Sequence, residues 1–135
     1  MTPAFRTTLI FEDEGGLSFR LVRPLVFDSG VLKRSITVPA GFVTDLASIP
    51  GAIWNILSPV GAYDAAAVVH DLLYRRGTVD ESPVQRVDAD RVLREGMEAL
   101  GVRRWQQWTI YAGVRVGGWM VWRRYRSATQ AKAAA

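Results

Sequence analysis

A single histidine lies within an otherwise apolar stretch of the chain. Residues 63–74 read Tyr-Asp-Ala-Ala-Ala-Val-Val-His-Asp-Leu-Leu-Tyr, so Asp71 directly follows His70 and Tyr74 comes four residues after the histidine. On a helix, His70 and Tyr74 share a face, whereas Asp71 lies about 100° further round and can serve a different partner. A neutral imidazole can take a proton near pH 7. The pattern therefore indicates a reactive or metal-binding site.

Burying these polar groups requires partners, because an unpaired buried charge is costly. Two other places in the chain offer them. Asp45 and Ser48 lie in an otherwise apolar segment, where helix capping and ligation are both open. A second predicted helix opens with Asp88 and Asp90. Asp88 is favoured as the N-cap, and Asp90 is either a site carboxylate or a first-turn residue stabilised by the helix dipole.

Three main helices are predicted to position these groups. The first is centred on Tyr63–Tyr74 and closes with two arginines and Gly77, which suits a left-handed residue past a helix end. The second runs from Asp88 to about Leu100, and its two aspartates can supply the partners if it packs antiparallel to the first. The third is predicted as one long helix from Arg103 to Arg126, followed by a frayed tail.

The N-terminal forty residues predict strands rather than helices. Apolar and β-branched residues alternate there between turn signals. The predicted strands are Thr7–Phe11, Leu17–Val22, Leu25–Phe27 and Val31–Val38. We therefore expect an α+β fold in a single domain, 1–135. It has a small antiparallel β-meander over 1–40, a helical part with the site over 41–126, and a flexible tail over 127–135.

Composition narrows the function classes. The chain has 135 residues, is 49% hydrophobic and has no cysteine, which excludes disulfides, thiolate metal sites and cysteine nucleophiles. A formal charge of +4 allows anionic partners without requiring them.

No signal peptide is visible. The least polar stretch, Trp108–Trp122, is too short to span a membrane and contains Arg115. Packing on the domain is favoured for this helix over an interfacial position.

The residues around the histidine resemble a known active site. Ala-Ala-Val-Val-His-Asp-Leu-Leu-Tyr, followed by Asp-Ala-Asp-Arg-Val-Leu, is similar to the two-helix site of secreted phospholipase A2, most of all to the cysteine-free version in parvovirus capsid proteins. The resemblance implies that His70 is a general base, Asp90 orients it with support from Tyr74, and Asp71 binds Ca²⁺. The family's Tyr-x-Gly-x-Gly calcium loop is absent. Either Asp45 replaces it as a second metal ligand, or no metal binds.

A second resemblance covers more of the chain. Gly-Phe-Val-Thr-Asp-Leu-Ala-Ser-Ile-Pro, then His-Asp-Leu-Leu-Tyr, then Ala-Asp, is similar to an uncharacterised family of short proteins from tailed phages and prophages. The resemblance runs from about Ser18 to Trp122. It implies a phage origin and location in a virion or the host cytoplasm, but no established activity.

Three hypotheses for function follow. The first is a small hydrolase that acts on host envelope lipid during phage entry or lysis. The second is a non-catalytic virion, tail or assembly protein that binds other phage structural proteins, in which the His70 and Asp71 network is structural. The third, nucleic-acid binding through the basic C-terminal helix, is the weakest because the charge is modest and no recognised motif is present.

Overall fold

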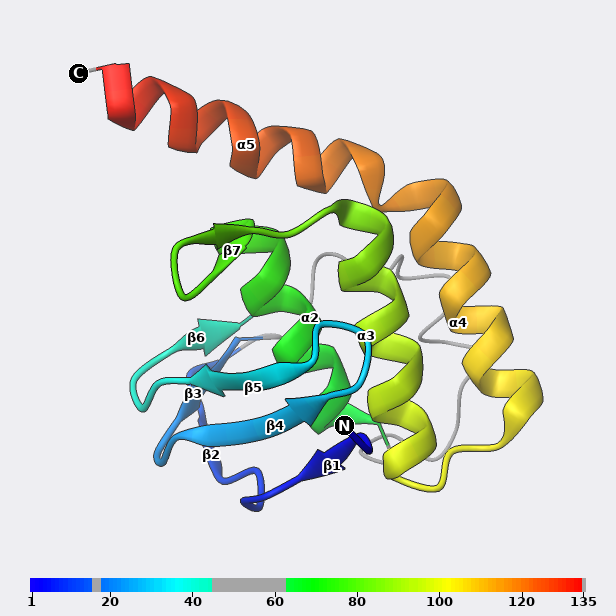
Figure 1. The fold of residues 1–135 in the computed structure, drawn as a ribbon. Helices are drawn as coiled ribbons and strands as arrows, with labels where there is room; N and C mark the ends of the chain where they lie inside the picture. Colours follow the sequence, from blue (N-terminus) through cyan, green and yellow to red (C-terminus); the bar gives the residue numbers. More distant parts are fainter. Residues whose placement is uncertain (16–17, 45–62, 135) are drawn as a thin grey trace.

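The N-terminal strands form two small antiparallel sheets. The computed structural model of the chain describes residues 1–15, 18–44 and 63–134 (Figure 1). One sheet has the order β1-β4-β5 and the other the order β2-β3-β6. The strands are β1 Ala4–Phe5, β2 Phe11–Asp13, β3 Phe19–Leu21, β4 Leu25–Ser29, β5 Arg34–Val38 and β6 Val43–Thr44. The α+β class is therefore confirmed.

The strand details differ from the expected meander. Residues 7–10 connect β1 to β2 and are not a strand, so the predicted strand Thr7–Phe11 is wrong except at its end. β1 pairs with β4 rather than with the next strand along the chain. In β4 and β5, Phe27 and Ile36 face each other across the pair and are buried. That buried face, rather than sequence order, fixes the register.

Four helices follow within the part of the chain that the structure describes, not the predicted three. They are α2 Asp64–Arg76, α3 Arg86–Ala99, α4 Arg104–Gly117 and α5 Trp119–Ala134. The predicted long third helix is interrupted at Gly118, and the expected frayed tail continues as helix to Ala134. The end of α2 matches the prediction, because Gly77 adopts φ 67° and its N–H bonds to the Leu73 carbonyl.

A short hairpin joins α2 to α3. It consists of β7 Thr78–Val79 and β8 Ser82–Pro83, where the sequence predicts a surface loop. Its two turn residues, Asp80 and Glu81, have φ of 50° and 68°. Two consecutive left-handed residues define the turn type that matches the twist of a two-residue hairpin.

The helices α2 and α3 pack on the sheet β1-β4-β5 and on each other (Figure 1). The first half of α2 meets the second half of α3, where Gly96 lies against Ala66, so the two helices run antiparallel as predicted. Helix α4 packs on α3, and α5 packs on the end of α2 before projecting past the body of the molecule (Figure 1).

The Arg126 side chain links α5 to the end of α2. Arg126 donates from Nη2 to the carbonyls of Tyr74 and Arg75, at 2.8 and 2.7 Å. Those carbonyls belong to the last turn of α2, where a cation is favoured. No helix among the described residues is long and apolar enough to cross a bilayer.

Candidate functional site

The residues predicted on two separate helices meet in the interior. His70 and Tyr74 lie one turn apart on α2 and face Asp90 of α3. The His70 and Tyr74 rings are in contact, with centroids 4.3 Å apart. None of the three side chains has more than a trace of exposed surface. The antiparallel packing of α2 on α3 therefore brings together the three residues for which a catalytic role is predicted.

Asp90 is the centre of this arrangement. Its Oδ1 lies 2.8 Å from His70 Nε2 and accepts a hydrogen bond of 2.6 Å from the Tyr74 hydroxyl. Its Oδ2 accepts a hydrogen bond from Arg115 Nη1 at 2.8 Å and from Arg86 Nη1 at 3.4 Å. One carboxylate oxygen thus serves the aromatic pair, and the other serves two guanidinium groups.

The two arginines were not identified from the sequence. Arg86 precedes Asp90 by four residues on α3, a spacing that signals an ion pair and could have been noticed. It also donates to the carbonyls of Val114 and Arg115, at 3.0 and 3.2 Å, and so joins the start of α3 to the end of α4. Arg115 itself comes from α4, and only the packing of α4 on α3 brings it to the site.

The surroundings shift the pKa of two of these groups in opposite directions. Burial by itself would raise the pKa of Asp90, but the hydrogen bond and charge of His70, with hydrogen bonds from Tyr74 and Arg115, outweigh it and hold that pKa below its usual value. Burial, and then the Asp90 charge, raise the pKa of Tyr74 far above its usual range. Asp90 is therefore ionised and Tyr74 is a neutral donor at neutral pH.

The ionised Asp90 decides which imidazole nitrogen carries the hydrogen. An ionised carboxylate can only accept, so the short contact requires a hydrogen on Nε2 of His70. In the neutral ring, Nδ1 then carries the lone pair. The arrangement can orient an imidazole as a base, as the aspartate does in a catalytic triad.

Asp71 points to a different part of the molecule. Its Oδ2 accepts a 2.6 Å hydrogen bond from Thr44 Oγ1 in β6 and lies 3.1 Å from Arg75 Nε. The side chain is fully buried. Adjacent residues on α2 therefore serve two networks: His70 joins α2 to α3, whereas Asp71 joins α2 to the second sheet.

The other predicted site residues do not join the cluster around Asp90. Asp45 and Ser48 lie outside the described residues. Asp88 is not the N-cap: α3 begins at Arg86, and Asp88 instead pairs with Arg91 at 3.2 Å on the surface. Among residues 1–15, 18–44 and 63–134, no three histidine or acidic side chains gather as a metal-binding group.

The break between α4 and α5 lies directly against the site. A Cβ atom on Gly118 would come within 2.5 Å of both the Tyr74 hydroxyl and the Val114 carbonyl. Trp122, one turn further on, meets the Tyr74 ring edge-on, with centroids 5.2 Å apart. Glycine at this position lets the chain turn while closing over the tyrosine.

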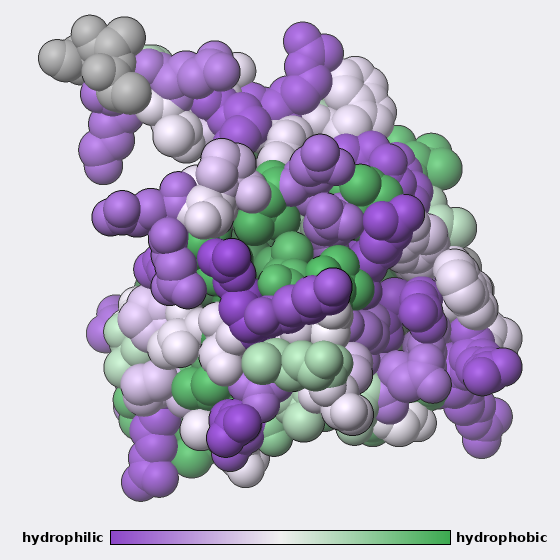
Figure 2. Space-filling view, in the orientation of Figure 1, coloured by the Kyte–Doolittle hydropathy of each residue, from purple (hydrophilic) through white to green (hydrophobic). Residues whose placement is uncertain are grey.

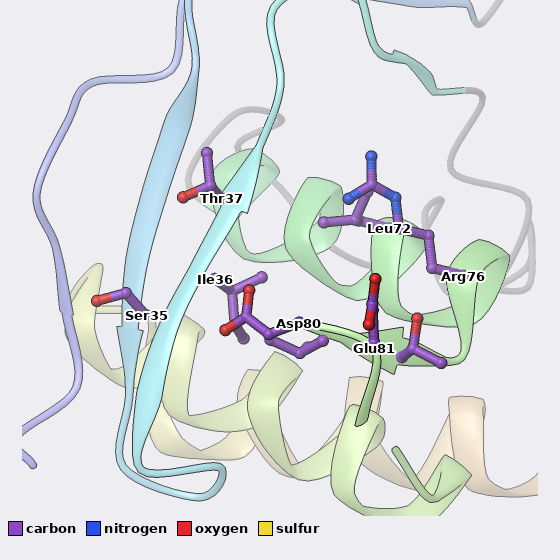
Figure 3. Close-up of a pocket in the computed structure, with 9 residues that line it drawn as sticks. Ser35, Ile36, Thr37, Leu72, Arg76, Asp80 and Glu81 are labelled. Atoms are coloured by element: carbon purple, nitrogen blue, oxygen red, sulfur yellow. The ribbon is translucent and has the colours of Figure 1, made fainter. Parts of the chain in front are cut away.

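A hollow of about 410 Å³ lies elsewhere, between β5, the end of α2 and the β7–β8 hairpin (Figure 3). Ile36 and Leu72 line its interior side, while Arg76, Asp80 and Glu81 line its polar edge. None of the predicted site residues lines it.

Comparison with known proteins identifies a family but no activity. Neither a search of curated proteins nor a search of solved structures found a match. A family model described as a protein of unknown function, DUF1353, matches residues 19–114, most of the chain and nearly the segment for which the family resemblance was noted. The matched segment contains both halves of the His70–Asp90 pair, and this chain therefore belongs to the DUF1353 family.

Proposed function

We propose that the chain is a phage-associated hydrolase that cleaves a phospholipid ester, with His70 as the general base. The observation that carries this proposal is the contact of His70 Nε2 and the Tyr74 hydroxyl with a single oxygen of Asp90. The resemblance to phospholipase A2 implies the same relation between its histidine, later aspartate and tyrosine. The geometry supports the resemblance because helix spacing places only His70 and Tyr74 together, whereas the packing of α3 on α2 brings Asp90 to both.

The proposed reaction uses the two nitrogens of His70 differently. Nδ1 removes a proton from a water molecule as the water oxygen attacks the ester carbonyl carbon. Asp90 stabilises the resulting imidazolium through Nε2, and Tyr74 holds the carboxylate in place. The imidazolium then gives its proton to the leaving alkoxide, which restores the neutral ring. Arg115 and Arg86 stay beside the other oxygen of Asp90 throughout, at 2.8 and 3.4 Å.

If Ca²⁺ takes part in the proposed function, Asp71 and Asp45 are the residues that would bind it. The described surroundings of Asp71 fit a cation poorly, because Oδ2 already contacts Thr44 and the positively charged Arg75. No step of the proposed reaction is therefore assigned to a metal. Calorimetric titration of Ca²⁺ into wild type and Asp71→Asn decides the matter: heat that is lost in the variant supports Asp71 as a ligand, and no heat from wild type removes calcium from the proposal.

Release of a fluorescent fatty acid from phospholipid vesicles, with and without Ca²⁺, tests the activity. His70→Asn should lower turnover by about 100-fold or more, because it removes the base. Asp88→Asn, two residues from Asp90 but on the surface, should keep wild-type turnover. Urea denaturation of both variants confirms that they are folded. Wild type without turnover on any of these vesicles contradicts the proposal.

The second candidate is a non-catalytic phage virion or assembly protein. Its specific support is burial: His70, Asp71 and Asp90 have essentially no exposed surface, as expected of a network that holds elements together. In that case wild type has no turnover on phospholipid, and the His70→Asn variant only loses stability. Detecting the protein in purified particles would support this role.

A further inference from the structure

The last two helices differ in charge from the rest of the chain. From Leu100 to the end there are seven cationic residues, whereas all 13 acidic residues of the protein lie before it. The cationic side chains are Arg103, Arg104, Arg115, Arg123, Arg124, Arg126 and Lys132. The modest net charge of +4 is therefore the sum of a strongly basic segment after Leu100 and a preceding part in which acidic residues outnumber basic ones.

The same two helices expose large apolar side chains. We call them the apolar ridge: Trp105 (53% exposed), Trp108 (52%), Val116 (77%), Trp119 (45%) and Met120 (58%). On α4 they alternate with the buried Ile110 and Val114 at helical spacing, so they occupy the outer face. Such a concentration of exposed apolar side chains marks an interaction site.

Cationic groups lie among the ridge residues. Figure 2 shows apolar surface bordered by hydrophilic surface over the junction of α4 and α5, at the upper right. The guanidinium groups of Arg94 and Arg123 lie over the rings of Trp108 and Trp119, 4.8 and 5.6 Å from the ring centroids. Tryptophan beside arginine on a helix surface is the composition of segments that lie in a membrane interface.

We propose that the apolar ridge docks on an anionic phospholipid bilayer, with α4 and α5 lying in its interface. Charge complementarity selects this partner, since the segment has no acidic residue of its own. Arg115 pairs with Asp90 and Arg126 binds carbonyls of α2, but the other five cationic residues are exposed. Exposed Val116 and Met120 favour lipid over nucleic acid, because phosphate contacts use the cations but give apolar side chains nowhere to be buried. The docking lies along the surface, in keeping with the absence of a spanning helix among the described residues.

The ridge adjoins the candidate site. Arg115, which holds Asp90, immediately precedes Val116, and Gly118 between Val116 and Trp119 lies against the Tyr74 hydroxyl. Docking would therefore place the bilayer on the outer side of the α4–α5 junction, whose inner side contacts Asp90 and Tyr74. This part of the inference rests on the proposed function, because it names the surface that delivers the substrate, whereas docking itself requires no turnover.

Co-sedimentation with vesicles tests the docking. Wild type should bind equimolar phosphatidylglycerol and phosphatidylcholine vesicles and should bind pure phosphatidylcholine weakly. The triple variant Val116→Ser, Trp119→Ser, Met120→Ser should lose about ten-fold or more in affinity. Arg123→Gln with Arg124→Gln should lose about five-fold for each charge removed.

Matched controls carry the same chemical changes away from the ridge. Ile10→Ser with Val22→Ser removes exposed apolar groups, and Arg23→Gln with Lys33→Gln removes two charges; both should bind as wild type. Wild type that fails to bind anionic vesicles overturns the inference, as does an equal loss in the controls. Tighter binding to duplex DNA than to vesicles, unchanged in the triple variant, overturns it in favour of nucleic acid.

The two proposals fail in different ways. His70→Asn should bind vesicles like wild type. If wild type and this variant both bind but neither releases fatty acid, the docking surface stands and the hydrolase proposal falls. If wild type turns over dispersed lipid but does not bind vesicles, the hydrolase stands and the docking surface falls.

Discussion

Two buried carboxylates lie five residues apart on α3 and are held in opposite ways. Asp90 meets His70, Tyr74 and two guanidinium groups, and its pKa is lowered. Glu95 accepts hydrogen bonds from the Ser29 hydroxyl and from the N–H groups of Gly30 and Val31, at 3.1 and 3.0 Å for the latter two. Burial raises the pKa of Glu95, and these donors only partly offset it.

The difference shows what separates a site carboxylate from a structural one. The hydrogen bond and charge of His70, with hydrogen bonds from Tyr74 and Arg115, keep Asp90 ionised in the interior, so the carboxylate and a charged imidazole stabilise each other. The neutral donors around Glu95 satisfy its oxygens and fix the β4–β5 turn on α3, but together with the charge of Arg94 they do not offset the effect of burial on its pKa. Only Asp90 has surroundings suited to acid–base chemistry. Four predictions test this contrast, from the largest expected effect to the smallest.

Asp90→Asn should have the largest effect. It leaves His70, Arg86 and Arg115 around a neutral amide, and losing one partner of a buried ion pair costs about 3–5 kcal/mol. Urea denaturation measures the free energy of unfolding. Asp88→Asn, on the same helix but on the surface, should change it by about 0.5 kcal/mol or less. Equal values for the two variants would show that Asp90 does not hold the helices together.

Gly118→Ala should cost about 1–3 kcal/mol, because the new methyl group overlaps the Tyr74 hydroxyl and a carbonyl of α4. Gly30→Ala is the matched change beside Glu95. There the Cβ would lie 2.7 Å from the carbonyl oxygen of Met1, an exposed chain end that can move, so the cost should be smaller. Thermal unfolding of both variants compares them, and a larger loss at Gly30 would contradict the expected order.

Tyr74→Phe removes one hydrogen bond to an ionised carboxylate and should cost about 1.5–2 kcal/mol. Because the phenyl ring remains, packing against Trp122 is kept. Urea denaturation, alone and combined with Gly118→Ala, measures the effect. The cost of the glycine change should fall in the phenylalanine background, since one of the two overlaps is gone; fully additive costs would refute the close approach.

The smallest expected effect is in the pH dependence of the free energy of unfolding, where Asp90 and Glu95 should act in opposite directions. Asp90 has a lowered pKa, so its contribution is present above about pH 4 and is lost as the pH falls through its folded-state value. Glu95 has a raised pKa, so its contribution decreases as the pH rises from about 4.5 through its folded-state value.

Glu95→Gln isolates this second contribution. The variant should lose the decrease in stability between about pH 4.5 and neutrality, while keeping the loss in acid that Asp90 causes. Unfolding free energies measured across the pH range for wild type and the variant provide the comparison. An unchanged pH profile would mean that Glu95 ionises in the fold as easily as in the unfolded chain.

The features that could be predicted from the sequence have local signals, such as helix-ending residues and apolar periodicity. Arginines followed by Gly77 mark the end of α2, and the apolar periodicity of 88–100 marks most of α3. A contact of His70 with a carboxylate of the next helix was also expected, because a buried imidazole needs a partner, and the resemblance to phospholipase A2 singled out Asp90. The metal role of Asp71 and Asp45 stays a prediction, the latter outside the described residues.

Long-range packing explains what was missed. The sequence from Arg103 to Arg126 has a continuous helical pattern, yet the chain turns at Gly118 because α5 packs on the end of α2 and Arg126 bonds to its last carbonyls. The packing of α4 on α3 brought Arg115 to the site. The strand pairing of β1 with β4 likewise depends on contacts between distant segments.

The sequence by itself determined the α+β class, the helix that presents His70 and the carboxylates available to it, because helix ends, periodicity and the cost of burying charge are local properties. Only the tertiary structure decided that Asp90 contacts His70 and two guanidinium groups directly while the oxygens of Glu95 contact neutral donors, and that a tryptophan-rich face of α4 and α5 remains exposed. Both depend on which surfaces of distant helices meet, and that is set by the packing of the whole chain rather than by any one segment.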